Sequence, residues 1–162
     1  MQTKLRTVVI IVALLAGLSP AQANFEQGTM RVGAGMGLRG GDDGVTFSFS
    51  GSFGFYVLKG LGLSITPLVQ TGGGEPTLIM LTTDLRYIPF PDLHIAPYID
   101  GGGGRLFVFD YSDAWVASAG AGMIYLFGDW YGLDMGAGYR WYFFPEDTQG
   151  SYYVNIGLLL IF

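Results

Sequence analysis

The sequence offers few side chains that could carry out covalent or metal chemistry. It contains one histidine, His94, and no cysteine, which excludes a histidine-rich metal site, a thiolate metal site and a cysteine nucleophile. No serine or glutamate stands near His94 in the sequence, so no nucleophile and base are paired there. The glycine-rich runs lack the lysine and the strand-to-helix turn of a phosphate-binding loop. We therefore predict no catalytic residue, no metal site and no cofactor.

The composition excludes two further classes of protein. Phe, Trp and Tyr make up 15% of the 162 residues, which is more than a disordered chain contains. The formal net charge of −5 is the opposite of the basic excess that nucleic-acid binding requires. We therefore expect a folded protein that has no nucleic-acid partner.

The first 23 residues have the features of a secretory signal peptide. Lys4 and Arg6 give a positively charged N-terminal region, residues 8–18 form an apolar stretch, and Ala21-Gln22-Ala23 forms a cleavage site. After residue 23 no run of 18 or more apolar residues occurs, so we predict no membrane-spanning helix. The prediction is that residues 1–23 are removed on export and that residues 24–162 form one domain.

The remaining sequence has a period of two. Between Met30 and Leu38 apolar residues alternate with glycine and arginine, which is typical of a β-strand with two different faces. Residues 45–57 repeat the pattern with valine and phenylalanine against serine and threonine. Turn-forming residues separate eight such segments. We predict strands at 28–39, 45–57, 61–70, 77–88, 94–109, 114–127, 131–143 and 151–162.

The two faces of these strands differ in polarity. One face carries Val, Leu, Ile, Met and aromatic residues, and the other carries Gly, Ser, Thr, Asp and Arg. The apolar face is larger than the patches that soluble monomers tolerate, so we place it in lipid, where all backbone groups must pair and the sheet must close. The predicted fold class is all-β, an eight-stranded antiparallel up-and-down transmembrane β-barrel. The alternative is a soluble periplasmic ligand-binding β-barrel with an apolar interior.

The polar face of each predicted strand points into the barrel. Its alternating positions carry three arginines and three aspartates. An eight-stranded barrel has room inside only for side chains, and unpaired charges there are costly, so we predict an ion network that plugs the lumen rather than a conducting pore. Its predicted members are Arg31, Asp84, Arg86, Asp100, Asp134 and Arg140. A turn centred near residues 147 and 148 would place Arg140 opposite Asn155. Arg105 points outward unless a bulge at residues 101–104 changes the register.

The last predicted strand alternates six apolar residues on its lipid-facing side and ends on phenylalanine. These residues are Tyr152, Val154, Ile156, Leu158, Leu160 and Phe162. The series resembles the signal by which outer-membrane proteins are recognised by the barrel assembly machinery. Residues 97–104, 120–125 and 136–140 look like the middle and late hairpins of the OmpA-like and OmpX-like eight-stranded barrel family, and the resemblance covers residues 25–162.

This resemblance implies an outer-membrane location with the N-terminus in the periplasm. The implied partners are outer-membrane lipid, lipopolysaccharide and, during biogenesis, the barrel assembly machinery; we expect a monomer. Some barrels on this scaffold modify lipid A with a histidine, a serine and an acid near the outer rim, whereas His94 should lie at the periplasmic end. We therefore predict a non-enzymatic protein with a structural or surface-interaction role, with a lipid A-modifying enzyme as the alternative. The predicted outer loops, 39–44, 71–76, 110–113 and 144–150, are shorter than those of partner-binding family members.

Overall fold

The computed structural model describes residues 25–41, 44–72, 75–108 and 113–162, so the predicted signal peptide lies outside the described residues. The described residues form β1 (Met30–Gly41), β2 (Gly44–Leu58), β3 (Leu61–Gly72), β4 (Glu75–Tyr87), β5 (Ile95–Val108), β6 (Ala114–Leu126), β7 (Tyr131–Phe143) and β8 (Thr148–Ile161). The predicted all-β class and the eight strands are confirmed. None of the described residues belongs to a helix long and apolar enough to span a membrane.

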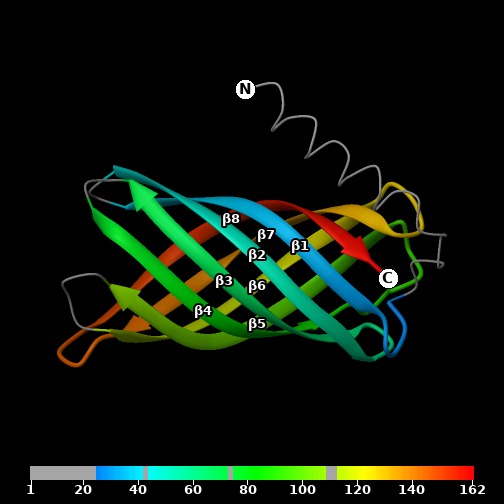
Figure 1. Cartoon of the computed structure of the whole chain (residues 1–162), viewed down its shortest axis with the longest axis horizontal. Coiled ribbons are helices and arrows are strands. Elements are labelled where there is room, and N and C mark those ends of the chain that lie inside the picture. Colours follow the sequence, from blue (N-terminus) through cyan, green and yellow to red (C-terminus); the bar gives the residue numbers. More distant parts are fainter. Residues whose placement is uncertain (1–24, 42–43, 73–74, 109–112) are drawn as a thin grey trace, which may run out of the picture.

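The eight strands form one closed sheet in which each strand pairs with its neighbours in the sequence. β1 closes the barrel by pairing antiparallel with β8, from Arg31 opposite Ile161 to Leu38 opposite Val154. Figure 1 shows the strands as a tilted, continuous wall in which β1 begins and β8 ends at the same end of the barrel. We call this end the termini end and the opposite one the loop end. Closure leaves no strand with an unpaired edge, which is the condition for a sheet in lipid.

The outer face of the barrel is largely apolar. The side chains of Met36, Phe49 and Leu158 are 59%, 57% and 63% exposed. Aromatic rings gather near both ends of the barrel, as the girdles of transmembrane barrels do at the two membrane interfaces. The exposed rings near the termini end include Tyr87, Phe90, Phe127 and Tyr131, and those near the loop end include Phe107, Trp115, Trp141, Phe143 and Tyr152. A soluble barrel would keep such side chains inside, so the soluble alternative does not fit.

The pairing register settles the orientation of Arg105. The pairs between β4 and β5 run without a shift from Leu78 opposite Val108 to Tyr87 opposite Ile99, so the glycine run 101–104 contains no bulge. Arg105 therefore points outward, where its guanidinium lies 3.4 Å from the carboxylate of Asp113 and 5.2 Å from the ring centre of Trp115. Register shifts occur instead in β2, between Tyr56 and Leu58, and in β3, between Gln70 and Gly72.

The inner face is less uniformly polar than the sequence pattern suggested. Two clusters of buried apolar side chains lie inside the barrel, one toward each end. The cluster at the termini end consists of Phe25, Tyr56, Ile88, Ala96, Tyr98, Ile124, Leu159 and Ile161. The cluster at the loop end consists of Leu68, Leu78, Met80, Leu106, Ala114, Val116 and Tyr142. The charged side chains of the predicted network lie in a polar layer between these two clusters, whereas the buried polar residues Thr46 and Gln70 lie near the loop end.

Candidate functional site

A polar cavity of about 130 Å³ lies inside the barrel, in the layer between the two apolar clusters. All six residues of the predicted ion network line this cavity. β1 and β2 contribute only small side chains to its middle, because Gly33, Gly35 and Gly37 lie opposite Ser52, Ser50 and Ser48. The larger charged and aromatic side chains come mainly from β4 to β8. The small side chains of β1 and β2 therefore leave space for the cavity on their side of the lumen.

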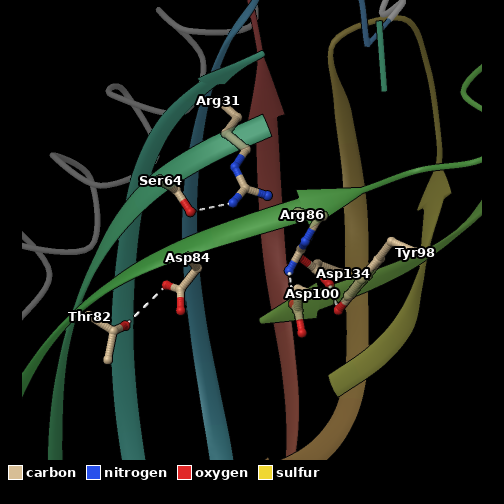
Figure 2. Close-up of polar contacts among 8 residues, drawn as sticks. All are labelled: Arg31, Ser64, Thr82, Asp84, Arg86, Tyr98, Asp100 and Asp134. Carbon is tan, nitrogen blue, oxygen red and sulfur yellow. Dashed lines mark hydrogen bonds and ion pairs between the residues drawn. The ribbon is translucent and has the colours of Figure 1, made fainter. Parts of the chain in front are cut away.

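Arg86 on β4 is the centre of the charged contacts. Its guanidinium forms ion pairs with Asp134 on β7, at 2.5 Å, and with Asp100 on β5, at 3.1 Å. The same group lies 3.7 Å from the ring centre of Tyr98, whose hydroxyl donates a hydrogen bond of 2.7 Å to Asp134 (Figure 2). Arg86 is buried, with 7% of its surface exposed. Three strands are therefore linked across the lumen through one guanidinium, and charge-assisted hydrogen bonds of this kind are strong.

The other predicted members of the network have neutral partners. Arg31 donates a hydrogen bond to Ser64, and Asp84 accepts one of 3.1 Å from Thr82 (Figure 2). The guanidinium of Arg140 lies 4.7 Å from the ring centre of Tyr153. Among the described residues, neither Arg31 nor Arg140 has a carboxylate within ion-pair distance. The structure thus brings three of the six residues together and leaves the other three apart from them.

The predicted cross-strand partner of Arg140 is wrong. Arg140 lies opposite Ser151, and Asn155 lies opposite Gly136. The reason is the turn: β8 begins at Thr148, which pairs with Phe143, so only residues 144–147 connect the two strands. A turn four residues long moves the register by four positions relative to the longer loop that the sequence suggested.

One cation of the lumen was missed by the sequence analysis. Arg39 on β1 lies 5.3 Å from the ring centre of Tyr142, a buried residue of the apolar cluster at the loop end. Arg39 lies an even number of residues after Arg31 in β1, so the two side chains fall on the same face of the strand. This alternation could have identified Arg39 as an inward-facing residue. The inward-facing charged side chains in the described strands are therefore four arginines and three aspartates.

Inward-facing glycines make room for the tyrosine rings of the lumen. A Cβ atom at Gly136 would lie 2.5 Å from the hydroxyl oxygen of Tyr98, and one at Gly120 would lie 2.7 Å from that of Tyr153. Real Cβ atoms do not approach other heavy atoms this closely, so these tyrosines could not keep their positions over larger residues. The glycine-rich segments of β6 and β7 therefore shape the lumen and fix where its aromatic rings lie.

The termini end is held together by contacts of the first described residues. Phe25 is fully buried and packs edge-on against Tyr56. Lys59, in the turn between β2 and β3, forms ion pairs with Asp92 at 2.8 Å and with Glu26 at 3.1 Å. The ammonium also forms hydrogen bonds with these two carboxylates, and these bonds raise the pKa of Lys59. The bond to Asp92 has the larger effect. The lysine therefore stays charged at neutral pH, and on the alkaline side the two bridges are lost as the pH rises through this raised pKa.

His94 also lies at the termini end, as the sequence predicted. It directly precedes β5, its side chain is exposed, and its backbone carbonyl accepts a hydrogen bond from the amide of Leu126. In the part of the chain that the structure describes, no group of three or more His, Asp or Glu residues could hold a metal ion.

The predicted assembly signal forms the outer face of β8 and the residue that follows it. Tyr152, Val154 and Leu158 are 77%, 61% and 63% exposed. Phe162 exchanges two backbone hydrogen bonds of 2.9 Å with Met30, so the last residue of the chain is joined to the first residue of β1. The aromatic terminus thus lies at the seam where the barrel closes.

A closed antiparallel barrel with an apolar outer face, two bands of aromatic rings and a charged interior is an outer-membrane β-barrel. Proteins of this class reside in the outer membrane, as predicted from the sequence. No family model matches the chain, and no curated protein matches it.

Solved structures of eight-stranded outer-membrane barrels resemble the chain. The N-terminal β-barrel domain of OprF from Pseudomonas aeruginosa matches with a TM-score of 0.69 and 16% identity, over 84% of this chain and 98% of that domain. Neisserial surface protein A matches with a TM-score of 0.64 and 17% identity, over 83% of this chain and 96% of that protein. OprG from Pseudomonas aeruginosa matches with a TM-score of 0.63 and 13% identity, over 88% and 99%. At these identities the likeness is one of fold, and it confirms the predicted resemblance at that level.

Proposed function

We propose that this chain is a small, non-enzymatic outer-membrane β-barrel with a structural or surface-interaction role, and that its lumen does not conduct ions. The observation that carries the proposal is the cross-lumen contact of Arg86 with Asp100 and Asp134. An ion that passed through the barrel would have to displace this buried and hydrogen-bonded group, because the interior of an eight-stranded barrel is filled by side chains.

The apolar clusters on either side of the polar layer support the proposal. Each cluster contains side chains from several strands that meet inside the barrel. An ion would have to give up its hydration to pass between such side chains, which is costly in a low-dielectric environment. Conduction would therefore require both apolar layers to separate and the Arg86 contacts to break.

Recordings in planar lipid bilayers test this proposal. We expect purified wild-type protein to show no steady conductance. Arg86→Ala should show transient openings or lower stability, whereas Arg105→Ala, which removes an outward-facing arginine, should remain silent. Stable, large channels of the wild-type protein would contradict the proposed closed lumen.

The position of His94 supports a non-enzymatic role. Lipid A lies in the outer leaflet, whereas the periplasmic N-terminus that the family resemblance implies would put the termini end, and with it His94, on the opposite side of the membrane. Incubation of the folded protein with labelled lipid A should therefore yield no product. A product that disappears in the His94→Ala variant would favour the lipid A-modifying enzyme instead.

We also propose that β8 provides the recognition signal for the barrel assembly machinery. The exposed, in-phase apolar residues of this strand and the position of Phe162 at the seam support it. The other proposed partners, outer-membrane lipid and lipopolysaccharide, are those that the apolar outer face would contact in this membrane.

A further inference from the structure

The described residues that precede β1 lie at the termini end of the barrel (Figure 1). We call residues 25–28 the N-terminal strap. The strap turns at Gly28, whose φ of +86° is a conformation that glycine adopts readily and other residues rarely do. The amide of Thr29 donates a hydrogen bond of 3.2 Å to the carbonyl of Glu26 across this turn. The Phe25 ring is thereby brought into the mouth of the barrel, where it is fully buried.

Phe25 completes the apolar cluster at the termini end without belonging to the sheet. The other buried members of this cluster lie in strands or, in the case of Ile88, directly after one. Phe25 packs edge-on against Tyr56, with the ring centres 5.4 Å apart. The strands pair around the whole barrel without residues 25–28. Closure of the sheet and closure of its mouth by Phe25 are therefore two separate events.

The strap has few backbone bonds to the rest of the barrel. Among the described residues there are two: the carbonyl of Phe25 accepts a hydrogen bond of 2.7 Å from the amide of Gly60, and the amide of Gly28 donates one of 2.8 Å to the carbonyl of Tyr56. Each strand, by contrast, is bonded to a neighbour on both sides. The strap is therefore held less firmly than the wall that it closes.

The side chains of the strap add one ion pair. The carboxylate of Glu26 lies 3.1 Å from the ammonium of Lys59, and the two side chains are 47% and 45% exposed. Exposed pairs of this kind contribute little to stability. The burial of the Phe25 ring is therefore the main contribution that keeps the strap in place.

We propose that the N-terminal strap is a lid that opens and closes the termini end of the lumen while the barrel stays folded. Opening requires less free energy than unfolding, because it exposes one ring and breaks few bonds. The contacts of Arg86 and the apolar cluster at the loop end stay in place, so an open strap admits water to one end of the lumen without creating a path through it. The inference does not rest on the role proposed above.

Amide hydrogen exchange of the wild-type protein in detergent micelles tests whether the strap opens separately. The reporter is the Gly60 amide, whose acceptor lies on the strap, and the reference is the Leu126 amide, which donates to the carbonyl of His94 at the same end of the barrel. After correction for intrinsic rates, the Gly60 amide should exchange faster by about 10-fold or more. Equal rates would overturn the proposal, since the strap would then open only together with the strands.

Introduced cysteines measure access to the lumen, because the chain contains none of its own. Ala96→Cys places a thiol in the cluster at the termini end and Ala114→Cys places one in the cluster at the loop end, and both alanines are buried. Adding Phe25→Ala should raise the rate at which a water-soluble maleimide labels position 96 by about 100-fold or more. Position 114 should be unaffected. An unchanged rate at position 96 would overturn the proposal.

Gly28→Ala separates opening of the strap from loss of packing. A Cβ atom at Gly28 meets no other atom within 4 Å, so the variant clashes with nothing, but alanine is strained at a positive φ by an amount that should favour the open strap about 10-fold. Labelling at position 96 should rise accordingly while the barrel keeps its resistance to SDS before heating. Labelling at the wild-type rate would contradict the proposal. If Phe25→Ala does not fold, this variant and the exchange of the wild-type protein decide the question.

Discussion

Gly122→Ala should destabilise the barrel more than any change of one methyl group on its outer face. Gly122 lies on the inner face of β6, and a Cβ atom there would lie 2.5 Å from both Cζ and the hydroxyl oxygen of Tyr98. It would also clash with the backbone carbonyl of Met135 on β7, which cannot rotate away as a side chain can. Tyr98 and the spacing of β6 and β7 would both have to change.

The expected cost follows from what Tyr98 does in the lumen. Overpacking of a well-packed interior costs about 1–3 kcal/mol. Displacing the ring also weakens the 2.7 Å hydrogen bond to Asp134, and a hydrogen bond to a charged group contributes about 1.5–3 kcal/mol. Together these effects predict a loss of about 3 kcal/mol or more, which is large compared with the marginal stability of a folded chain.

Urea unfolding in lipid vesicles, followed by tryptophan fluorescence, measures this loss. The matched control is Gly51→Ala in β2, where the nearest heavy atom to the new Cβ would be the carbonyl oxygen of Gly33 at 3.9 Å. Because alanine is favoured over glycine within a strand, this variant should be as stable as the wild-type protein or slightly more stable. Equal destabilisation by the two substitutions would refute the reasoning, since it would mean that Tyr98 does not occupy the space above Gly122.

Three further predictions test the charged layer, the two faces and the seam. Arg86→Met should lower the free energy of unfolding by about 3–5 kcal/mol, because it leaves two buried aspartates without their partner; a loss below 1 kcal/mol in urea unfolding would mean that these carboxylates are solvated. Ala34→Arg should reduce stability by about 2–4 kcal/mol, since it places a charge among acyl chains, and Gly35→Ser, on the inner face, should cost less; the reverse order would shift the register of β1 by one residue. Phe162→Ala keeps the backbone pair with Met30, so it should reduce the yield of folded protein in the outer membrane while changing the stability of refolded protein little; an unchanged yield in cell fractions would argue against the assembly signal.

Alternation along the strands made most of the barrel predictable. Residues such as Met36 and Phe49 face outward as their parity requires, and a shift of one residue would have exposed glycine and serine to lipid instead. Arg105 was assigned to the outer face by the same rule, and the unbroken register of β4 and β5 agrees with it. Where one face is strongly apolar, period two determines the orientation of every residue in the strand.

The ends of the lumen were not predictable by this rule, because both faces are apolar there. Leu78 and Met80 point inward while Ile79 and Leu81 point outward, so the sequence reads as a continuous apolar run. Such a run indicates a strand that packs on both sides, and this signal could have located the apolar cluster at the loop end. The register of β7 and β8 was missed for a different reason: it depends on the length of a turn, and one turn residue more or less moves every cross-strand pair.

The contacts within the polar layer also lay beyond the sequence. Parity assigned Arg31, Arg86 and Arg140 to the lumen together, but it did not distinguish the arginine that binds two aspartates from the two with neutral partners. That distinction depends on the height of each residue along the barrel axis, which the tilt of the strands determines. It requires coordinates in three dimensions rather than positions along each strand.

Heat-modifiable migration of the protein in outer-membrane fractions tests the central claim, that this chain is a closed outer-membrane barrel, most directly. A closed transmembrane barrel stays folded in SDS without heating, because every strand is paired on both sides. The account predicts that the protein fractionates with the outer membrane and that unheated samples migrate differently from boiled ones. Recovery in the soluble periplasmic fraction, with identical migration before and after boiling, would contradict it.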